Sequence, residues 1–162
     1  MNIYITCFSN IRYFTKDIIP ISTAVGWPWW LYKADKEPSG TLYLNKNSVM
    51  IGISEEQFSC KDVYESLEEK CQKNCPYKDK VPDCQFMKAY YNHLSTLNFN
   101  EIIDDWKRVA EEVRKINHFQ GEPTIVLLVY EAASCTCAER PCLQKWFKEN
   151  GYELKEWKRK IE

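Results

Sequence analysis

The chain has 162 residues, 44% of them hydrophobic, so it can form one domain with a single core and is too apolar for an intrinsically disordered protein. Its 22 Lys and Arg residues are balanced by 23 Asp and Glu residues, which excludes a global positive field that would attract nucleic acid. The first residues lack a signal-peptide pattern and no apolar run reaches membrane length, so we expect a cytoplasmic protein.

Short strands are predicted in the first third of the chain. Residues 2–7 alternate between apolar and more polar side chains, and the turn-forming Ser9 and Asn10 follow them. A second strand is predicted at Ile18–Ser22, before an aromatic loop at 26–30 that contains Gly and Pro. Two further strands are expected at 41–44 and 48–53.

The middle of the chain has helical periodicity. One helical pattern starts at Lys61 and is broken between residues 74 and 83. Apolar residues then recur on one side of two further helices, the second of which we expect Asn100 to cap. These residues are Phe86, Tyr90, Leu94 and Leu97 in the first helix and Ile103, Trp106, Val109, Val113 and Ile116 in the second. Both helices are expected to cover a sheet.

The continuous apolar run at 124–130 predicts a central parallel strand that is buried on both faces. After a cysteine-containing turn, Pro141 suits the start of a helix and Gly151 its end, and a last strand is expected within 152–157. The alternation of strands and helices predicts one domain over 1–162. We expect an α/β three-layer sandwich with a mostly parallel, Rossmann-like sheet of about five strands.

Several motifs follow one another in a defined order. Ile3–Asn10 is a strand and turn, Pro20–Ser22 lies in a second strand, and Phe86–Tyr90 has Phe and Tyr four residues apart on a helix. The apolar strand Ile125–Glu131 ends in Glu and is followed by cysteines, an Arg and then Trp146. This order resembles the domain-of-unknown-function 488 family, whose members are small α/β proteins.

The resemblance assigns family positions to the turn after the apolar strand. Alignment on Trp146 places Arg140 on the family's Arg and Glu139 on its His, and Cys137 lies one residue before the family's Cys. The family signature is therefore altered at its His position. Residues 60–84 look like a cysteine-bearing helical insertion.

The two polar turns at 7–10 and 131–142 should both lie at the carboxyl edge of the sheet, where doubly wound folds bind ligands. A helix N-terminus beside an Arg attracts anions, so we predict a small anionic, nucleotide-like ligand at this edge, with nucleic acid as an alternative partner. In this hypothesis Arg140 holds the anion and Trp29 stacks on a base. The predicted ligand-binding residues are Ser9, Asn10, Trp29 and Arg140.

Glu131 and Cys137 are the candidate catalytic residues. Glu131 can act as a general base or a substrate ligand, or it can bind exposed backbone amides of the turn. Cys137 lies just before a helix N-terminus and three residues from Arg140, and both features favour a thiolate. A binding protein and an enzyme are both consistent with these residue types.

The eight cysteines suggest a metal site rather than disulfides in a reducing compartment. Cys71 and Cys75 are four residues apart, so on one helix they share a face. The alternative function is therefore a zinc- or iron–sulfur-stapled interaction module that binds protein or nucleic acid, although reduced core thiols explain the same residues. The first candidate ligand set is Cys60, Cys71, Cys75 and Cys84, and the alternative set is Cys7, Cys135, Cys137 and Cys142.

Overall fold

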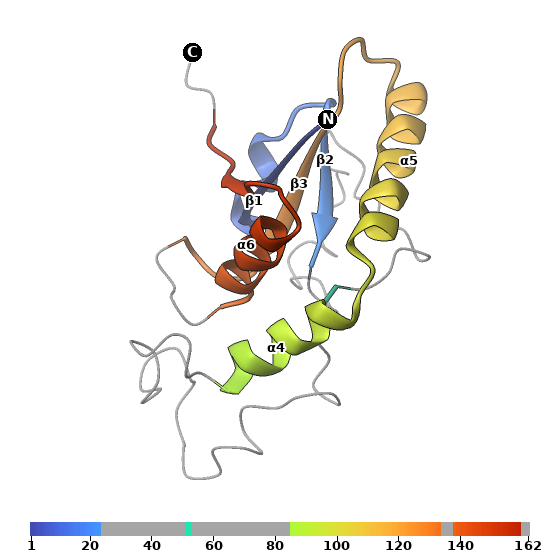
Figure 1. The fold of residues 1–162 in the computed structure, drawn as a ribbon. Helices are drawn as coiled ribbons and strands as arrows, with labels where there is room; N and C mark the ends of the chain where they lie inside the picture. Colours follow the sequence, from blue (N-terminus) through green and yellow to red (C-terminus); the bar gives the residue numbers. More distant parts are fainter. Residues whose placement is uncertain (24–50, 53–84, 134–137, 160–162) are drawn as a thin grey trace.

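The computed structural model describes residues 1–23, 51–52, 85–133 and 138–159. Within these residues the strands form a parallel four-stranded sheet in the order β2-β3-β1-β4 (Figure 1). The strands are β1 (Asn2–Cys7), β2 (Ile18–Ser22), β3 (Thr124–Val129) and β4 (Lys155–Glu156). The predicted mixed α/β fold with a parallel sheet is therefore confirmed.

Helical elements connect the strands. A 3-10 helix, η1 (Phe8–Tyr13), follows β1, and α4 (Gln85–Thr96) and α5 (Phe99–Asn117) precede β3. The last helix, α6 (Glu139–Glu149), lies between β3 and β4. In Figure 1 the arrow of β2 points toward α4, which identifies the sheet edge nearest to that helix as the carboxyl edge.

The central strand β3 is buried on both faces, as predicted. Ile125, Leu127 and Val129 point into a cluster that contains side chains from α4, α5 and α6. Val126 and Leu128 point to the opposite face, where side chains of η1 and the residues beside it pack. All five side chains have 0% exposure. Because neither face of β3 contacts water, its sequence is a continuous apolar run rather than an alternating pattern.

The finer prediction of a three-layer sandwich with about five strands is not confirmed by the described residues. The three α-helices that they contain pack against one face, whereas η1, Phe14 and Trp157 pack against the other. The predicted strand at 41–44 lies outside the described residues. Ile51 and Gly52, the described part of the strand predicted at 48–53, are not in a strand, and Ile51 is buried in the core.

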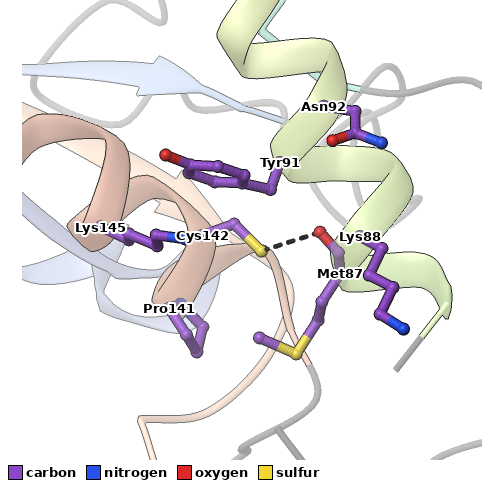
Figure 2. A pocket seen from close by; sticks show the side chains of 7 residues that line it. All are labelled: Met87, Lys88, Tyr91, Asn92, Pro141, Cys142 and Lys145. Atoms are coloured by element: carbon purple, nitrogen blue, oxygen red, sulfur yellow. Dashed lines mark hydrogen bonds between the residues drawn. The ribbon is translucent and has the colours of Figure 1, made fainter. Parts of the chain in front are cut away.

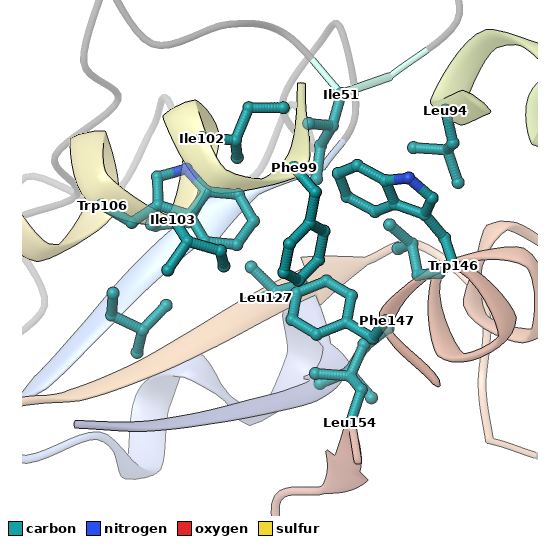
Figure 3. Packing of buried hydrophobic residues seen from close by; sticks show 14 of the residues in the cluster. Ile51, Leu94, Phe99, Ile102, Ile103, Trp106, Leu127, Trp146, Phe147 and Leu154 are labelled. Atoms are coloured by element: carbon teal, nitrogen blue, oxygen red, sulfur yellow. The ribbon is translucent and has the colours of Figure 1, made fainter. Parts of the chain in front are cut away.

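Aromatic side chains join α5 to α6 (Figure 3). The Phe99 ring packs edge-on against Trp146, with 4.8 Å between the ring centroids, and against Phe147, with 5.1 Å. Trp106 from the next turns of α5 stacks near Phe147 at 6.3 Å. These contacts fix the position of α6, whose N-terminus reaches the carboxyl edge of the sheet.

Asn98, and not the predicted Asn100, caps α5. The Asn98 side chain accepts a hydrogen bond from the Glu101 backbone N–H at 3.4 Å and donates one to the Glu101 carboxylate at 2.8 Å. This reciprocal pairing satisfies a backbone amide that has no partner within the helix.

Gly151 follows the C-terminal end of α6. It has φ +83°, and this left-handed conformation ends the helix as predicted.

Trp106 is 1% exposed, so truncating its side chain should strongly reduce the stability of the fold. We expect Trp106→Ala to lower the free energy of unfolding by about 3–5 kcal/mol, because it removes buried aromatic area and leaves a cavity. Ile116→Ala on the same helix is the control, since Ile116 is 60% exposed and its change should stay within about 0.5 kcal/mol. Urea unfolding measures both, and equal effects would contradict this description of the core.

Candidate functional site

The strand register brings distant segments of the chain to one edge. Cys7 at the end of β1 pairs with Val129 at the end of β3, and Ser22 at the end of β2 pairs with Leu128. The polar residues that follow these strands, among them Thr23 and Glu131, therefore lie at the same carboxyl edge. The first turn of α6 reaches this edge as well.

Glu139, in the first turn of α6, is bound to the residue that follows β2. It is 8% exposed, and its carboxyl oxygen lies 2.8 Å from the Thr23 hydroxyl. The same hydroxyl lies 3.0 Å from the backbone oxygen of Leu128 on β3. One threonine hydroxyl thus joins the N-terminus of α6 to the end of the central strand.

The Thr23–Glu139 contact is compatible with both protonation states of Glu139. The Leu128 oxygen also accepts the Thr23 backbone N–H at 3.1 Å, so it does not depend on the Thr23 hydroxyl. When Glu139 is ionised, the Thr23 hydroxyl donates to its carboxylate. When Glu139 is protonated, its O–H can donate to Thr23 while the Thr23 hydroxyl donates to Leu128.

Burial favours the neutral form of Glu139. Desolvation raises the pKa of Glu139 to about 7, with a smaller rise caused by the nearby Glu131 and an opposing effect of the hydrogen bond from Thr23. Burial also raises the pKa of Glu131, against the opposing effects of its own backbone N–H and of Arg140. Two carboxyl groups with different surroundings are thus placed at one edge of the sheet.

Tyr90 on α4 is the third polar side chain of this cluster. It is fully buried, and desolvation, followed by the negative charges of Glu139, Cys142 and Glu131, raises the pKa of its phenol well above the usual value. The phenol is therefore a neutral hydrogen-bond donor at physiological pH. Both carboxyl groups thus act electrostatically on Tyr90.

Arg140 is held by protein groups on two sides of β1. One terminal nitrogen donates to the carboxylate of Glu156 on β4, and the other donates to the backbone oxygen of Glu131 at 2.8 Å. The Arg140 side chain is only 5% exposed. Its charge is therefore already compensated, and the side chain joins α6 to the ends of β3 and β4 instead of facing solvent.

Three buried polar atoms in this region have no hydrogen-bond partner among the described residues. They are the Tyr90 hydroxyl, one carboxyl oxygen of Glu131 and the Nε of Arg140. An unsatisfied buried polar group costs about 1–3 kcal/mol, so native proteins leave few of them. Perturbed carboxyl groups beside unsatisfied donors are typical of functional sites.

Ser9 and Asn10 lie at the end of β1, as predicted, and bind local partners there. The Ser9 hydroxyl is 3.0 Å from the Cys7 thiol, and the Asn10 side-chain amide donates to the Thr6 hydroxyl at 2.7 Å. Ser9 is exposed, whereas Asn10 is half-buried. Among the predicted site residues, the structure thus places Ser9, Asn10, Glu131 and Arg140 at the carboxyl edge.

Only two of the eight cysteines in the predicted metal sites lie within the described residues. Neither Cys7 nor Cys142 forms a disulfide; Cys7 contacts Ser9, and the buried Cys142 donates to the backbone oxygen of Met87 at 3.5 Å. Within the described residues there is no group of three or more His, Cys, Asp or Glu side chains that could hold a metal ion. The zinc or iron–sulfur site stays a prediction. Trp29, Cys60, Cys71, Cys75, Cys84, Cys135 and Cys137 lie outside the described residues.

Sequence reasoning missed Thr23 and Tyr90 as site residues and gave Glu139 no site role. Thr23 directly follows a predicted strand, so its position at the carboxyl edge was a usable signal. Tyr90 belongs to the Phe86–Tyr90 motif, but its spacing marks it only as an apolar position on a helix. Glu156, the partner of Arg140, has no sequence signal because their pairing depends on the register of β4 against β1.

No family model matches the chain, and no curated protein or solved structure shows a significant similarity to it. The resemblance to the domain-of-unknown-function 488 family therefore stays a prediction. Among the helices that the structure describes, none has the length and apolar character needed to cross a membrane.

The contacts of Arg140 predict a structural effect of its removal. We expect Arg140→Ala to lower the free energy of unfolding by about 3 kcal/mol, because the half-buried Glu156 loses its partner. Lys155→Ala is the control: Lys155 forms an exposed ion pair with Glu153 at 3.0 Å, and its loss should cost less than about 1 kcal/mol. Chemical denaturation compares the two, and an equally small effect of Arg140→Ala would contradict the joining role.

The raised pKa of Glu139 predicts a pH dependence of stability. The folded protein binds a proton at Glu139 between the ordinary value of 4.5 and about 7, so stability falls as pH rises through this range. The expected loss from this group is about 3 kcal/mol. Glu139→Gln should remove most of this pH dependence of the unfolding free energy and leave the smaller contribution of Glu131. The exposed control variant Glu153→Gln should keep the full pH dependence. Urea unfolding from pH 4 to 8 checks this, and identical slopes in all three proteins would refute it.

Proposed function

We propose that the carboxyl edge binds a small hydroxyl-bearing ligand of the nucleoside or nucleotide type, and that Glu139 exchanges a proton with it. The observation that carries this proposal is the buried Glu139 carboxyl, which contacts the Thr23 hydroxyl at 2.8 Å, has a pKa raised to about 7 by burial and lies near a second carboxyl group. Carboxyl groups whose environments differ can divide the roles of acid and base between them.

The unsatisfied atoms indicate the ligand chemistry. The Tyr90 phenol and the Arg140 Nε offer donors, and the free carboxyl oxygen of Glu131 offers an acceptor. A ligand that both donates and accepts fits this set, as neighbouring sugar hydroxyl groups do. Because Glu156 already compensates Arg140, the hydroxyl-rich part of the ligand fits the cluster better than a phosphate does.

The N-terminus of α6 can bind a negatively charged group of the same ligand. The N-cap residue Ala138 supplies no side-chain cap, and helix N-termini favour anions through their free amides and dipole. Together with the hydroxyl-matching cluster, this end of the helix is consistent with a nucleotide-like ligand. In this proposal Glu131 acts as the base and Glu139 as the acid. Cys137, Ser9, Asn10 and Trp29 stay proposed contributors.

The proposal also includes the three-layer sandwich with a sheet of about five strands. A fifth strand and a complete third layer would make the sheet a Rossmann-like sandwich, the arrangement in which ligands bind at the carboxyl ends of the strands. The domain-of-unknown-function 488 resemblance and the cytoplasmic location are further parts of the proposal. The central parallel sheet and the polar cluster at its carboxyl edge support the sandwich architecture.

Tyr90→Phe tests the proposed function without removing part of the core. We expect adenosine and adenosine 5′-monophosphate to shift the backbone NMR signals of Thr23, Glu131 and Glu139, and Tyr90→Phe to weaken this binding about ten-fold. The variant should be at least as stable as the natural protein, because it removes an unsatisfied buried hydroxyl. A purely structural tyrosine would instead lose stability.

Tyr13→Phe is the matched control, since Tyr13 is 36% exposed and its ring contacts Arg12 and Arg159. It should leave both binding and stability unchanged. The absence of any shift at the carboxyl edge with millimolar concentrations of both compounds would contradict the proposed function.

A further inference from the structure

A separate pocket of about 360 Å³ lies between α4 and α6 (Figure 2). Six of the residues that line it carry the argument: Met87, Lys88 and Tyr91 from α4, and Pro141, Cys142 and Lys145 from α6. Pockets of roughly 300–1,000 Å³ hold small molecules in proteins, so the volume suits a compact ligand. The polar residues of the carboxyl-edge cluster do not line this pocket.

The wall of the pocket is mostly apolar and is fixed in position. Met87 is 6% exposed and Cys142 is 4% exposed. The Cys142 thiol donates to the Met87 backbone oxygen at 3.5 Å, which joins the two helices beneath the pocket (Figure 2). An apolar body placed here contacts the side chains of Met87, Tyr91 and Pro141, as the orientation of these side chains in Figure 2 shows.

Two lysines add positive charge to this apolar wall. The Lys145 ammonium lies 4.0 Å from the centroid of the Tyr91 ring and 3.9 Å from the Glu149 carboxylate, to which the Tyr91 hydroxyl also donates. Lys88 is exposed and forms no ion pair with any residue that the structure describes. Among the described residues, Glu149 therefore balances the charge of Lys145, whereas Lys88 has no acidic partner.

We propose that this pocket binds a small amphipathic anion, in which an apolar ring system carries a single sulfonate, carboxylate or phosphate group. The ring system packs on Met87, Tyr91 and Pro141, and the anionic group lies between Lys88 and Lys145. The charge of the two lysines selects an anion over a neutral compound of the same shape. This site is independent of the proposed function, because its residues are not those of the carboxyl-edge cluster.

Two dyes of similar shape test the proposal on the whole chain. 1-Anilinonaphthalene-8-sulfonate carries one sulfonate, whereas N-phenyl-1-naphthylamine has the same rings without charge. We expect the sulfonate to bind at least about five-fold more tightly in a fluorescence titration, since an ion pair of about 1 kcal/mol corresponds to that ratio. Equal affinities for the two dyes would overturn the proposal.

Lysine variants locate the binding site. Lys88→Gln and Lys145→Gln should each weaken sulfonate binding about five-fold and leave binding of the neutral dye unchanged. Lys115→Gln is the matched control, because Lys115 also lies 3.9 Å from a glutamate one helical turn away, Glu111. Lys107→Gln reports on a second pocket of about 320 Å³ that Lys107 lines. Loss of binding in Lys107→Gln, or no loss in either pocket variant, would overturn the assignment.

Cys142 gives a second readout that does not depend on the lysines. The sulfonate dye should slow alkylation of Cys142 by N-ethylmaleimide, followed by mass spectrometry of the individual peptides, because the thiol lies in the pocket wall. Alkylation of Cys7, which is half-buried at the end of β1, should keep its rate. Equal protection of both thiols, or of neither, would place the dye elsewhere.

Discussion

The parallel pairing of β3 with both β1 and β2 is the constraint on which the rest of the structure depends. Because the three strands run in one direction and end in register, residues more than one hundred positions apart meet at a single edge. The central strand itself is fully buried and offers no functional side chain. The polar groups of this edge therefore come from the residues that follow the strands, such as Thr23 and Glu131, and from the first turn of α6.

Two carboxyl groups at this edge differ because their partners differ. Glu139 is buried beside the Thr23 hydroxyl, and burial raises its pKa to about 7. Burial also raises the pKa of Glu131, but the positive charge of Arg140 opposes this rise. Arg140 thus has a positioning role: it joins α6 to β3 and β4 and acts on Glu131, while Glu156 compensates its charge. Two carboxyl groups with different partners at one edge are the consequence.

Local sequence patterns predicted the parts of the fold that depend on burial alone. The apolar run at 124–130 has the composition of a strand with two buried faces, and the spacing of Trp106 and its neighbours marks the inner side of α5. Local patterns did not predict which of two nearby asparagines caps α5. Asn98 is the cap because Glu101 completes a reciprocal pair with it, which Asn100 lacks. The Thr23–Glu139 and Arg140–Glu156 contacts depend on strand register, and no local pattern contains that information. The positions of Glu131 and Arg140 at the carboxyl edge were predicted, but their partners were not.

We propose that Glu139 exchanges its proton near pH 7, and titration of its side chain measures this exchange. In protein labelled with ¹³C at glutamate carboxyl groups, the signal that disappears in Glu139→Gln identifies Glu139, and its chemical shift can be followed from pH 4 to 9. We expect a midpoint of about 7, and Thr23→Val should raise it because the hydrogen bond that lowers the pKa of Glu139 is lost. A midpoint at the ordinary glutamate value, insensitive to Thr23→Val, would contradict this proposal.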